Sequence, residues 1–121
     1  MPHLTLDYSP NLPGFDPAAA LAAINQAAVA SGLFDEADIK SRAIACAHFQ
    51  VGLQPTGRAF AHLRAALLAG RSPAQRKELA DRLLAALNAT VDRKNGLKIQ
   101  LSVETVEIDR ASYAKEIVDG A

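Results

Sequence analysis

Polar and apolar side chains alternate from Pro2 to Tyr8, which is the pattern of a β-strand with one buried face. A loop rich in proline and glycine follows. Asp16-Pro17 then predicts the start of a helix, because an aspartate caps free backbone amides and a proline fits the first turn. Ser31-Gly32 predicts its end. The apolar face of this helix carries Leu21, Ile24 and Ala28. A second extended stretch is predicted over residues 39–51, closed by a turn over residues 52–57.

The second half of the chain repeats this order. Residues 58–68 alternate again, with Phe60, His62 and Arg64 opposite the apolar set. Ser72-Pro73 repeats the cap and proline signal and predicts a second helix. Its apolar residues recur at four-residue spacing: Leu79, Leu83, Leu87 and Val91. After a turn at Asn95-Gly96, a fourth strand begins at Leu97. Its alternation changes phase before Val106, which predicts a bulge or a change of environment. Residues 111–121 are predicted as a short helix over an edge or a neighbour.

The predicted order is therefore β-α-β-β-α-β, in a single α+β domain over residues 1–121. Two β-α-β halves, about 2–52 and 58–109, are followed by a C-terminal tail. Right-handed crossovers place both helices on one face of a four-stranded sheet. No predicted element is left to cover the other face, and the small, alanine-rich chain has few large apolar residues to build a core. We therefore expect it to associate with copies of itself.

Composition excludes several classes of function. The chain has 121 residues, 13 basic and 13 acidic side chains and thus no net charge, unlike a general nucleic-acid binder. No apolar run is long enough to span a membrane, and no secretory signal is visible, so we expect a cytoplasmic protein. Its one cysteine, Cys46, excludes an internal disulfide. Glycine-rich phosphate loops, nucleophile elbows and zinc spacings are absent from the sequence.

The neutral total hides an uneven charge distribution. Residues 1–38 contain no Lys or Arg, whereas residues 39–77 contain seven and no acidic residue. The basic residues of this block are Lys40, Arg42, Arg58, Arg64, Arg71, Arg76 and Lys77. The block is either a set of solvated faces or a local anion-binding site whose charge the rest of the chain balances.

Pro2 is the strongest catalytic candidate. A small second residue normally permits removal of the initiator methionine, and Pro2 would then carry a secondary amine at the start of the first predicted strand. An α-amine has a pKa of about 8, so a moderate decrease makes it a neutral base near pH 7. Partial burial and a nearby guanidinium both lower the pKa. If Met1 is retained, the Pro2 nitrogen belongs to an amide and this chemistry is lost.

Three segments resemble the 5-carboxymethyl-2-hydroxymuconate delta-isomerase family of the tautomerase superfamily, which uses an amino-terminal proline. They are Pro2-His3-Leu4, Ser31-Gly-Leu-Phe34 through Ile39-Lys-Ser-Arg42, and Ala59-Phe-Ala-His62 through Gly70-Arg-Ser72. The resemblance runs in order over nearly the whole chain and is weakest beyond Ile108. It implies a homotrimer whose sheets pack inward around the axis, with no metal or organic cofactor.

The resemblance also implies a reaction. Pro2 would take a proton from the dienol of a small anionic hydroxymuconate and return it to a distal carbon, giving an unsaturated oxo-diacid in aromatic-compound catabolism. Lys40, Arg42 and Arg71 match basic positions of the family and would bind the carboxylates and polarise the 2-oxo group. The family residue expected at position 40 is arginine. Lysine keeps the charge but cannot donate two parallel hydrogen bonds.

Other interpretations remain open from the sequence. His48 and His62 fall on predicted hairpin partners with Cys46 nearby, which allows a metal site, although no third ligand has metal spacing. Ordinary sheet histidines and a small buried cysteine are the alternative. His3 either orients substrate or is a plain strand residue. The whole chain could also be a non-catalytic ligand-binding or regulatory module on a ferredoxin-like scaffold, or catalyse another tautomerase-superfamily reaction with the same proline.

Overall fold

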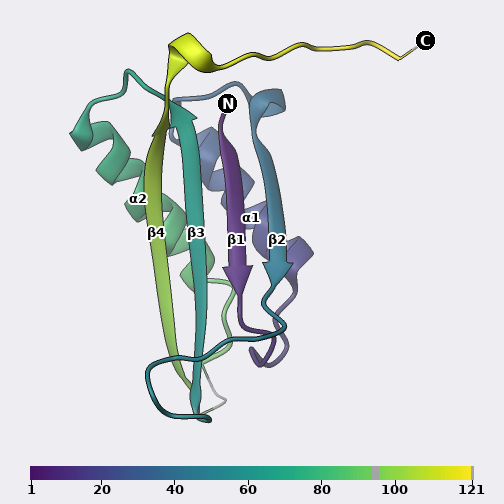
Figure 1. Ribbon diagram of the computed structural model, residues 1–121, viewed down its shortest axis with the longest axis vertical. Helices are drawn as coiled ribbons and strands as arrows, with labels where there is room; N and C mark the ends of the chain where they lie inside the picture. Colours follow the sequence, from purple (N-terminus) through teal and green to yellow (C-terminus); the bar gives the residue numbers. More distant parts are fainter. Residues whose placement is uncertain (94–95, 121) are drawn as a thin grey trace.

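The computed structural model of the chain describes residues 1–93 and 96–120. Four strands lie side by side with both helices behind them (Figure 1). The elements are β1 (His3–Tyr8), α1 (Pro17–Ala30), the 3-10 turn η1 (Glu36–Asp38), β2 (Lys40–Ala45), β3 (Arg58–Leu68), α2 (Pro73–Asn88), β4 (Lys98–Ile108) and the 3-10 turn η2 (Arg110–Ser112). The α+β class and the β-α-β-β-α-β order predicted from the sequence are confirmed.

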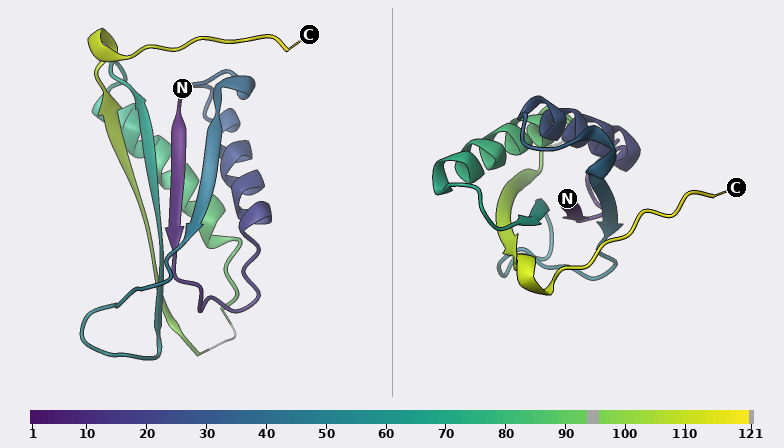
Figure 2. Two further views of the ribbon diagram at one scale, coloured as in Figure 1. Left: turned by 45° about the vertical axis from the view of Figure 1, so that its right-hand side comes forward. Right: turned by 90° about the horizontal axis from the view of Figure 1, so that it is seen from above.

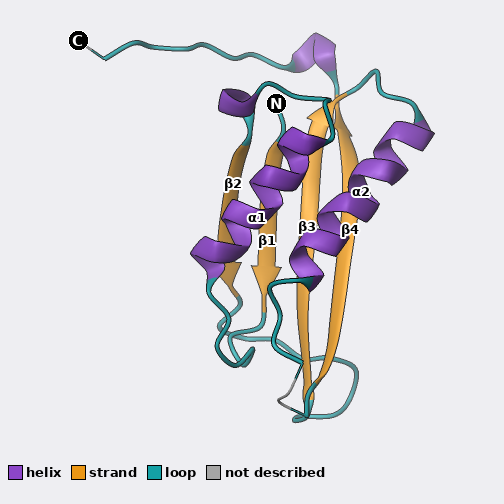
Figure 3. Ribbon diagram, turned by 180° about the vertical axis from the view of Figure 1, so that it is seen from behind, coloured by secondary structure: helices purple, strands orange, loops and turns teal. Residues whose placement is uncertain are grey.

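The sheet order is β2-β1-β3-β4. Strands β1 and β2 are parallel, as are β3 and β4, and the central pair β1 and β3 is antiparallel. Each helix is thus the crossover of one parallel pair, and both cover the same face of the sheet (Figure 3). The start of β1 lies between the start of β2 and the end of β3, because His3 pairs with Lys40 and with Ala66.

Both helices begin at the residues that the sequence indicates. The Asp16 side chain accepts hydrogen bonds from the first turn of α1, and Ser72 forms a reciprocal capping box with Gln75 at the start of α2. Helix α1 ends at Ala30, and Gly32, which follows the C-cap Ser31, has a φ of 74°, the left-handed conformation that glycine adopts easily. The α1 residues that are fully buried are Ala20, Ile24 and Ala28, whereas Leu21 is only half-buried.

The core lies between the helices and the sheet. Leu4 and Leu6 of β1 and alternate residues of β3 from Ala59 to Leu67 are fully buried against leucines of α2. The opposite set of side chains forms an open sheet face, which no helix or strand of the described chain covers (Figure 2). Only the loop after β2 reaches its lower end, where Phe49 packs against Phe60. Its middle carries charged and polar groups, and it becomes apolar toward the ends of β3 and β4.

Several local predictions are wrong. Strand β2 ends at Ala45, and residues 46–50 form no strand, so the extended stretch is shorter than predicted. Helix α2 ends at Asn88, which leaves Val91 outside it. The C-terminal residues form only the short turn η2 and then run as an extended segment without helix (Figure 1). The turn predicted at Asn95-Gly96 lies partly outside the described residues.

The phase change in β4 is a change of environment and not a bulge. The register between β3 and β4 is unbroken from Arg58 and Lys98 to Leu68 and Ile108. Ile108 therefore lies on the open sheet face beside Leu68, where the early part of β4 carries polar side chains. No helix among the described residues has the length and apolar character needed to cross a membrane.

Candidate active site

The start of the chain is fixed inside the fold. Pro2 is fully buried, and the side chain and backbone of Met1 are only 8% exposed. The carbonyl oxygen of Pro2 accepts a hydrogen bond from the backbone N–H of Lys40 at 3.1 Å. This bond extends the pairing of β1 and β2 up to Pro2, so the position of the Pro2 nitrogen is set by the sheet.

A pocket of about 290 Å³ opens at this end of the sheet. Its lining includes Met1, Phe34, Asp35, Asp38, Arg71 and Arg110. A larger cavity of about 470 Å³ lies on the other side of η1, between residues 25–30 of α1 and residues 36–39. None of the candidate catalytic or binding residues lines the larger cavity, whereas Arg71 lines the smaller pocket. The smaller pocket at the chain start is therefore the candidate active site.

Arg71 lies in this pocket and is held by neutral groups. Its guanidinium donates hydrogen bonds to the carbonyl oxygens of Leu68 at 3.2 Å and Leu33 at 2.9 Å. It also lies 5.0 Å from the ring centroid of Phe34. Within residues 1–93 and 96–120, no carboxylate is within ion-pair distance of Arg71. The side chain is thus oriented without being neutralised, as an anion-binding group requires.

The electrostatic surroundings favour a neutral amine at the chain start. Burial, followed by the positive charge of Lys40, lowers the pKa of the Met1 amine below the ordinary value of an α-amine. Asp38 acts in the opposite direction but is itself engaged by Lys115, whose Nζ lies 2.7 Å from Oδ1. The hydrogen bond from Lys115 holds the pKa of Asp38 below its usual range.

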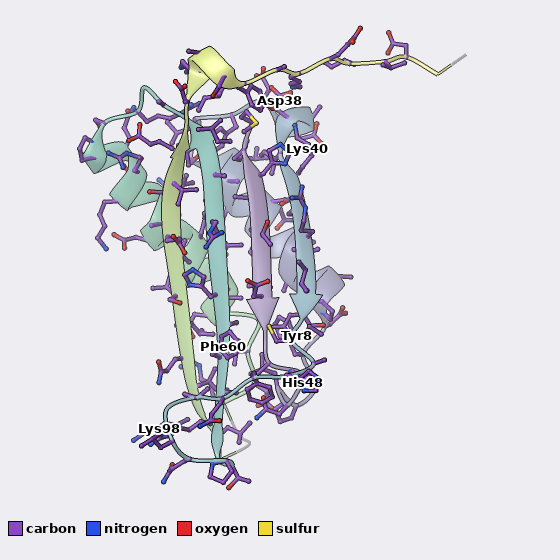
Figure 4. The ribbon with its side chains drawn as sticks, viewed as in Figure 1. Tyr8, Asp38, Lys40, His48, Phe60 and Lys98 are labelled. Carbon is purple, nitrogen blue, oxygen red and sulfur yellow. The ribbon has the colours of Figure 1, made fainter. Side chains whose placement is uncertain are left out.

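Of the three candidate cations, only Arg71 lines the pocket. Lys40 lies at the same end of the sheet as the chain start, beside Asp38 (Figure 4), and shares a sheet face with Arg42, because the two residues are two positions apart on β2. Arg42 does not line the pocket and lies on the open sheet face. Its Nη2 donates to Nδ1 of His3 at 3.1 Å. Burial, and then the charge of Arg42, lowers the pKa of His3, which agrees with a neutral ring accepting this bond.

The predicted pairing of His48 with His62 is wrong. Strand β1 lies between β2 and β3, and His48 follows the end of β2, at the opposite end of the sheet from Lys40 (Figure 4). His62 contacts Glu104 through Nε2 and Ser102 through Nδ1 instead. Cys46 is half-buried. Among the described residues, no three His, Cys, Asp or Glu side chains are placed to hold a metal ion.

Sequence reasoning missed several residues of the site. Phe34 belongs to one of the segments that carry the family resemblance, but its contact with Arg71 depends on the fold. Arg110 lines the pocket and Lys115 reaches Asp38 from the C-terminal tail, where the sequence has no periodic pattern. The signal that the sequence offers is the presence of charged residues in this tail, Asp109, Arg110, Lys115, Glu116 and Asp119. Their presence does not show which end of the sheet the tail approaches.

Comparison with known proteins decides the family. Residues 2–118 match the family described as 5-carboxymethyl-2-hydroxymuconate isomerase. The chain belongs to this family. It is therefore an isomerase of the 5-carboxymethyl-2-hydroxymuconate type, which selects the enzyme over the non-catalytic module. No curated protein matches the chain significantly.

Solved structures agree with the family. A 5-carboxymethyl-2-hydroxymuconate isomerase from Deinococcus radiodurans R1 is 32% identical, with a TM-score of 0.86 over 95% of this chain and 88% of its own. A 5-carboxymethyl-2-hydroxymuconate delta-isomerase is 18% identical, with a TM-score of 0.79 over 98% and 89%. A fused 4-OT symmetric trimer shares the fold at 22% identity and a TM-score of 0.71, over 93% and 90%. The chain thus has the fold of the tautomerase superfamily.

Proposed function

We propose that the protein isomerises a small anionic dienol acid with the amine of Pro2 as general base, once Met1 has been removed. The observation that carries the proposal is the position of the chain start. It is buried in a pocket beside the unneutralised Arg71, in surroundings that lower the pKa of an amine. A secondary amine that is neutral near pH 7 can both accept and return a proton.

The proposed reaction moves one proton and changes no oxidation level. The Pro2 nitrogen accepts the proton of the 2-hydroxyl group, and the electrons of the O–H bond form the 2-oxo group. The electron pairs of the diene shift along the chain, and the distal carbon takes the proton back from Pro2. Arg71 and Lys40 bind carboxylate and stabilise the negative charge that develops on the 2-oxygen.

We further propose a homotrimer in which the open sheet face is covered by neighbouring subunits. The uncovered face and the trimeric 4-OT structure of the same fold support this arrangement. Arg42 lies on that face, outside the pocket of its own chain, so it would reach a substrate only at such an interface. We also propose that the protein is cytoplasmic and acts in the catabolism of aromatic compounds.

Two measurements test the catalytic proposal. Intact mass should show a chain that begins at Pro2. Pro2→Ala should lower kcat/KM for 2-hydroxymuconate by about 10²- to 10⁴-fold, the contribution of a positioned general base, while native mass spectrometry shows the same assembly as the wild type. A retained Met1 in the active protein, or turnover unchanged in the variant, would contradict the role of Pro2.

A further inference from the structure

Arg71 and Arg110 are held by neighbouring carbonyls of one turn. Arg71 Nη1 donates to the carbonyl oxygen of Leu68 at 3.2 Å, and Arg110 Nε donates to the carbonyl oxygen of Ala69. The two guanidinium groups come from separate parts of the sequence, Arg71 from the segment before α2 and Arg110 from η2 after β4. Both line the pocket at the chain start.

Gly70 allows this arrangement. Its φ of 132° lies in the region that favours glycine, and a Cβ there would be 3.5 Å from Nη2 of Arg110. The Arg110 guanidinium therefore lies against Gly70 and lines the same pocket. Backbone carbonyls of the turn between β3 and α2 thus help to orient both cations.

The charges of these two cations are not matched within the described chain. Neither Arg71 nor Arg110 has a carboxylate within ion-pair distance among residues 1–93 and 96–120. Asp35 and Asp38 line the same pocket, but Asp38 is paired with Lys115, which leaves Asp35 as the carboxylate that opposes an incoming anion.

Both guanidinium groups keep free donors toward an anion. A guanidinium has five N–H donors, and the carbonyl bonds use two of them in Arg71 and one in Arg110. Two cations held on one turn repel each other, and a ligand with two negative groups relieves this repulsion. A ligand with two carboxylates offers one to each guanidinium.

We infer that Arg110 is a specificity-determining residue, which binds a second carboxylate of the substrate while Arg71 binds the first. This inference rests on the proposed function for the reaction, although the binding of dicarboxylates can be measured without turnover. The pocket then prefers a dicarboxylate to a monocarboxylate of the same length, and Arg110 supplies the preference.

Kinetics with two dienol acids test the inference. Arg110→Gln should lower kcat/KM for 2-hydroxymuconate by about 10- to 100-fold, the range of a lost charge-assisted hydrogen bond, mainly through KM. It should change kcat/KM for the monocarboxylate 2-hydroxy-2,4-pentadienoate by less than about 3-fold. Arg82→Gln removes the same charge from the exposed face of α2, where Arg82 pairs with Glu78, and should change neither value. Equal losses for the two substrates in Arg110→Gln would overturn the inference.

Binding of two non-reacting acids separates this inference from the proposed function. Calorimetry should show that the wild type binds adipate at least about 10-fold more tightly than hexanoate, and that Arg110→Gln loses this preference. If the wild type turns over neither dienol but shows this pattern, the proposed function fails and the role of Arg110 stands. Equal affinities for the two acids in the wild type overturn the inference without any variant, so a folding defect in Arg110→Gln cannot protect it.

Discussion

Lys115 and Asp38, 77 residues apart in the sequence, form an ion pair with 2.7 Å between Nζ and Oδ1. The pair joins the C-terminal tail to the turn before β2, and the tail crosses the end of the sheet where the chain begins (Figure 2). Lys115 also contributes to the lowered pKa of the Met1 amine. A segment that forms no helix or strand is thus connected to the candidate active site.

Lys115→Met should release the tail. We expect lower backbone order parameters for residues 113–119 in 15N relaxation measurements, because no other ion pair among the described residues holds this segment. The pair lowers the pKa of Asp38 and raises that of Lys115. The tail of the wild type should therefore stay ordered between the usual Asp and Lys values, about 4 and 10, and become mobile as the pH passes below or above this range. Lys77→Met, which breaks the exposed Lys77–Asp81 pair, should leave the tail unchanged.

Lys40→Met should shift the pH profile of catalysis. A general base is active when neutral, so kcat/KM rises with pH through the pKa of the free enzyme's amine. Burial is the first cause of the lowered pKa at the chain start and Lys40 the second, so removing this charge should raise the pKa and move the rising limb to higher pH. Lys98→Met, at the far end of the sheet (Figure 4), is the matched control and should leave the limb in place. A limb that does not move in Lys40→Met would show that Lys40 does not act on the base.

The elements of the fold could be predicted from local patterns, but their limits could not. The caps Asp16 and Ser72 are local signals and mark both helix starts correctly. The end of β2 depends on a neighbour that is remote in sequence. Its one partner, β1, ends at Tyr8, which pairs with Ala45, and after the bond from Cys46 N to Tyr8 O no strand is left to continue the pairing. Residues 46–50 were predicted to continue the strand, but without a partner they form no strand.

The residues of the candidate site also fall into those that the sequence could predict and those that depend on the fold. Pro2 and Arg71 could be proposed from residue type, charge pattern and resemblance. Arg110 could not, because its place depends on β4 running the full length of β3 and delivering η2 to the turn at Gly70. Arg42 carries the right chemistry, but one strand position decides the face on which a side chain lies, and Arg42 points to the open sheet face. Charge patterns in sequence give no such direction.

Leu83→Ala should destabilise the fold strongly. Leu83 is fully buried between α2 and the sheet, and removing such a leucine leaves a cavity that costs about 2–5 kcal/mol of unfolding free energy. Leu53→Ala is the matched control, because Leu53 is 92% exposed, and its effect should stay within about 0.5 kcal/mol. Urea denaturation followed by circular dichroism measures both. Equal effects would mean that the core does not lie between helices and sheet.

Glu104→Gln should reduce the acid sensitivity of the protein. Glu104 contacts Nε2 of His62 and lies 3.6 Å from Nε of Arg64, in the polar middle of the open sheet face. The hydrogen bond from His62 is the main cause of the lowered pKa of Glu104. A lowered pKa contributes stability above the usual Glu value of about 4.3, and this stability is lost as the pH falls through the folded-state pKa.

The Tm of the wild type should therefore fall on acidification, and the fall should be smaller in Glu104→Gln, which has already lost the charge. If the open face lies inside a trimer, native mass spectrometry should show dissociation over the same pH range in the wild type. Glu78→Gln removes an equal charge from the exposed face of α2 and should dissociate over the same pH range as the wild type. A fall in Tm that is equally steep in Glu104→Gln would place the acid-sensitive group elsewhere.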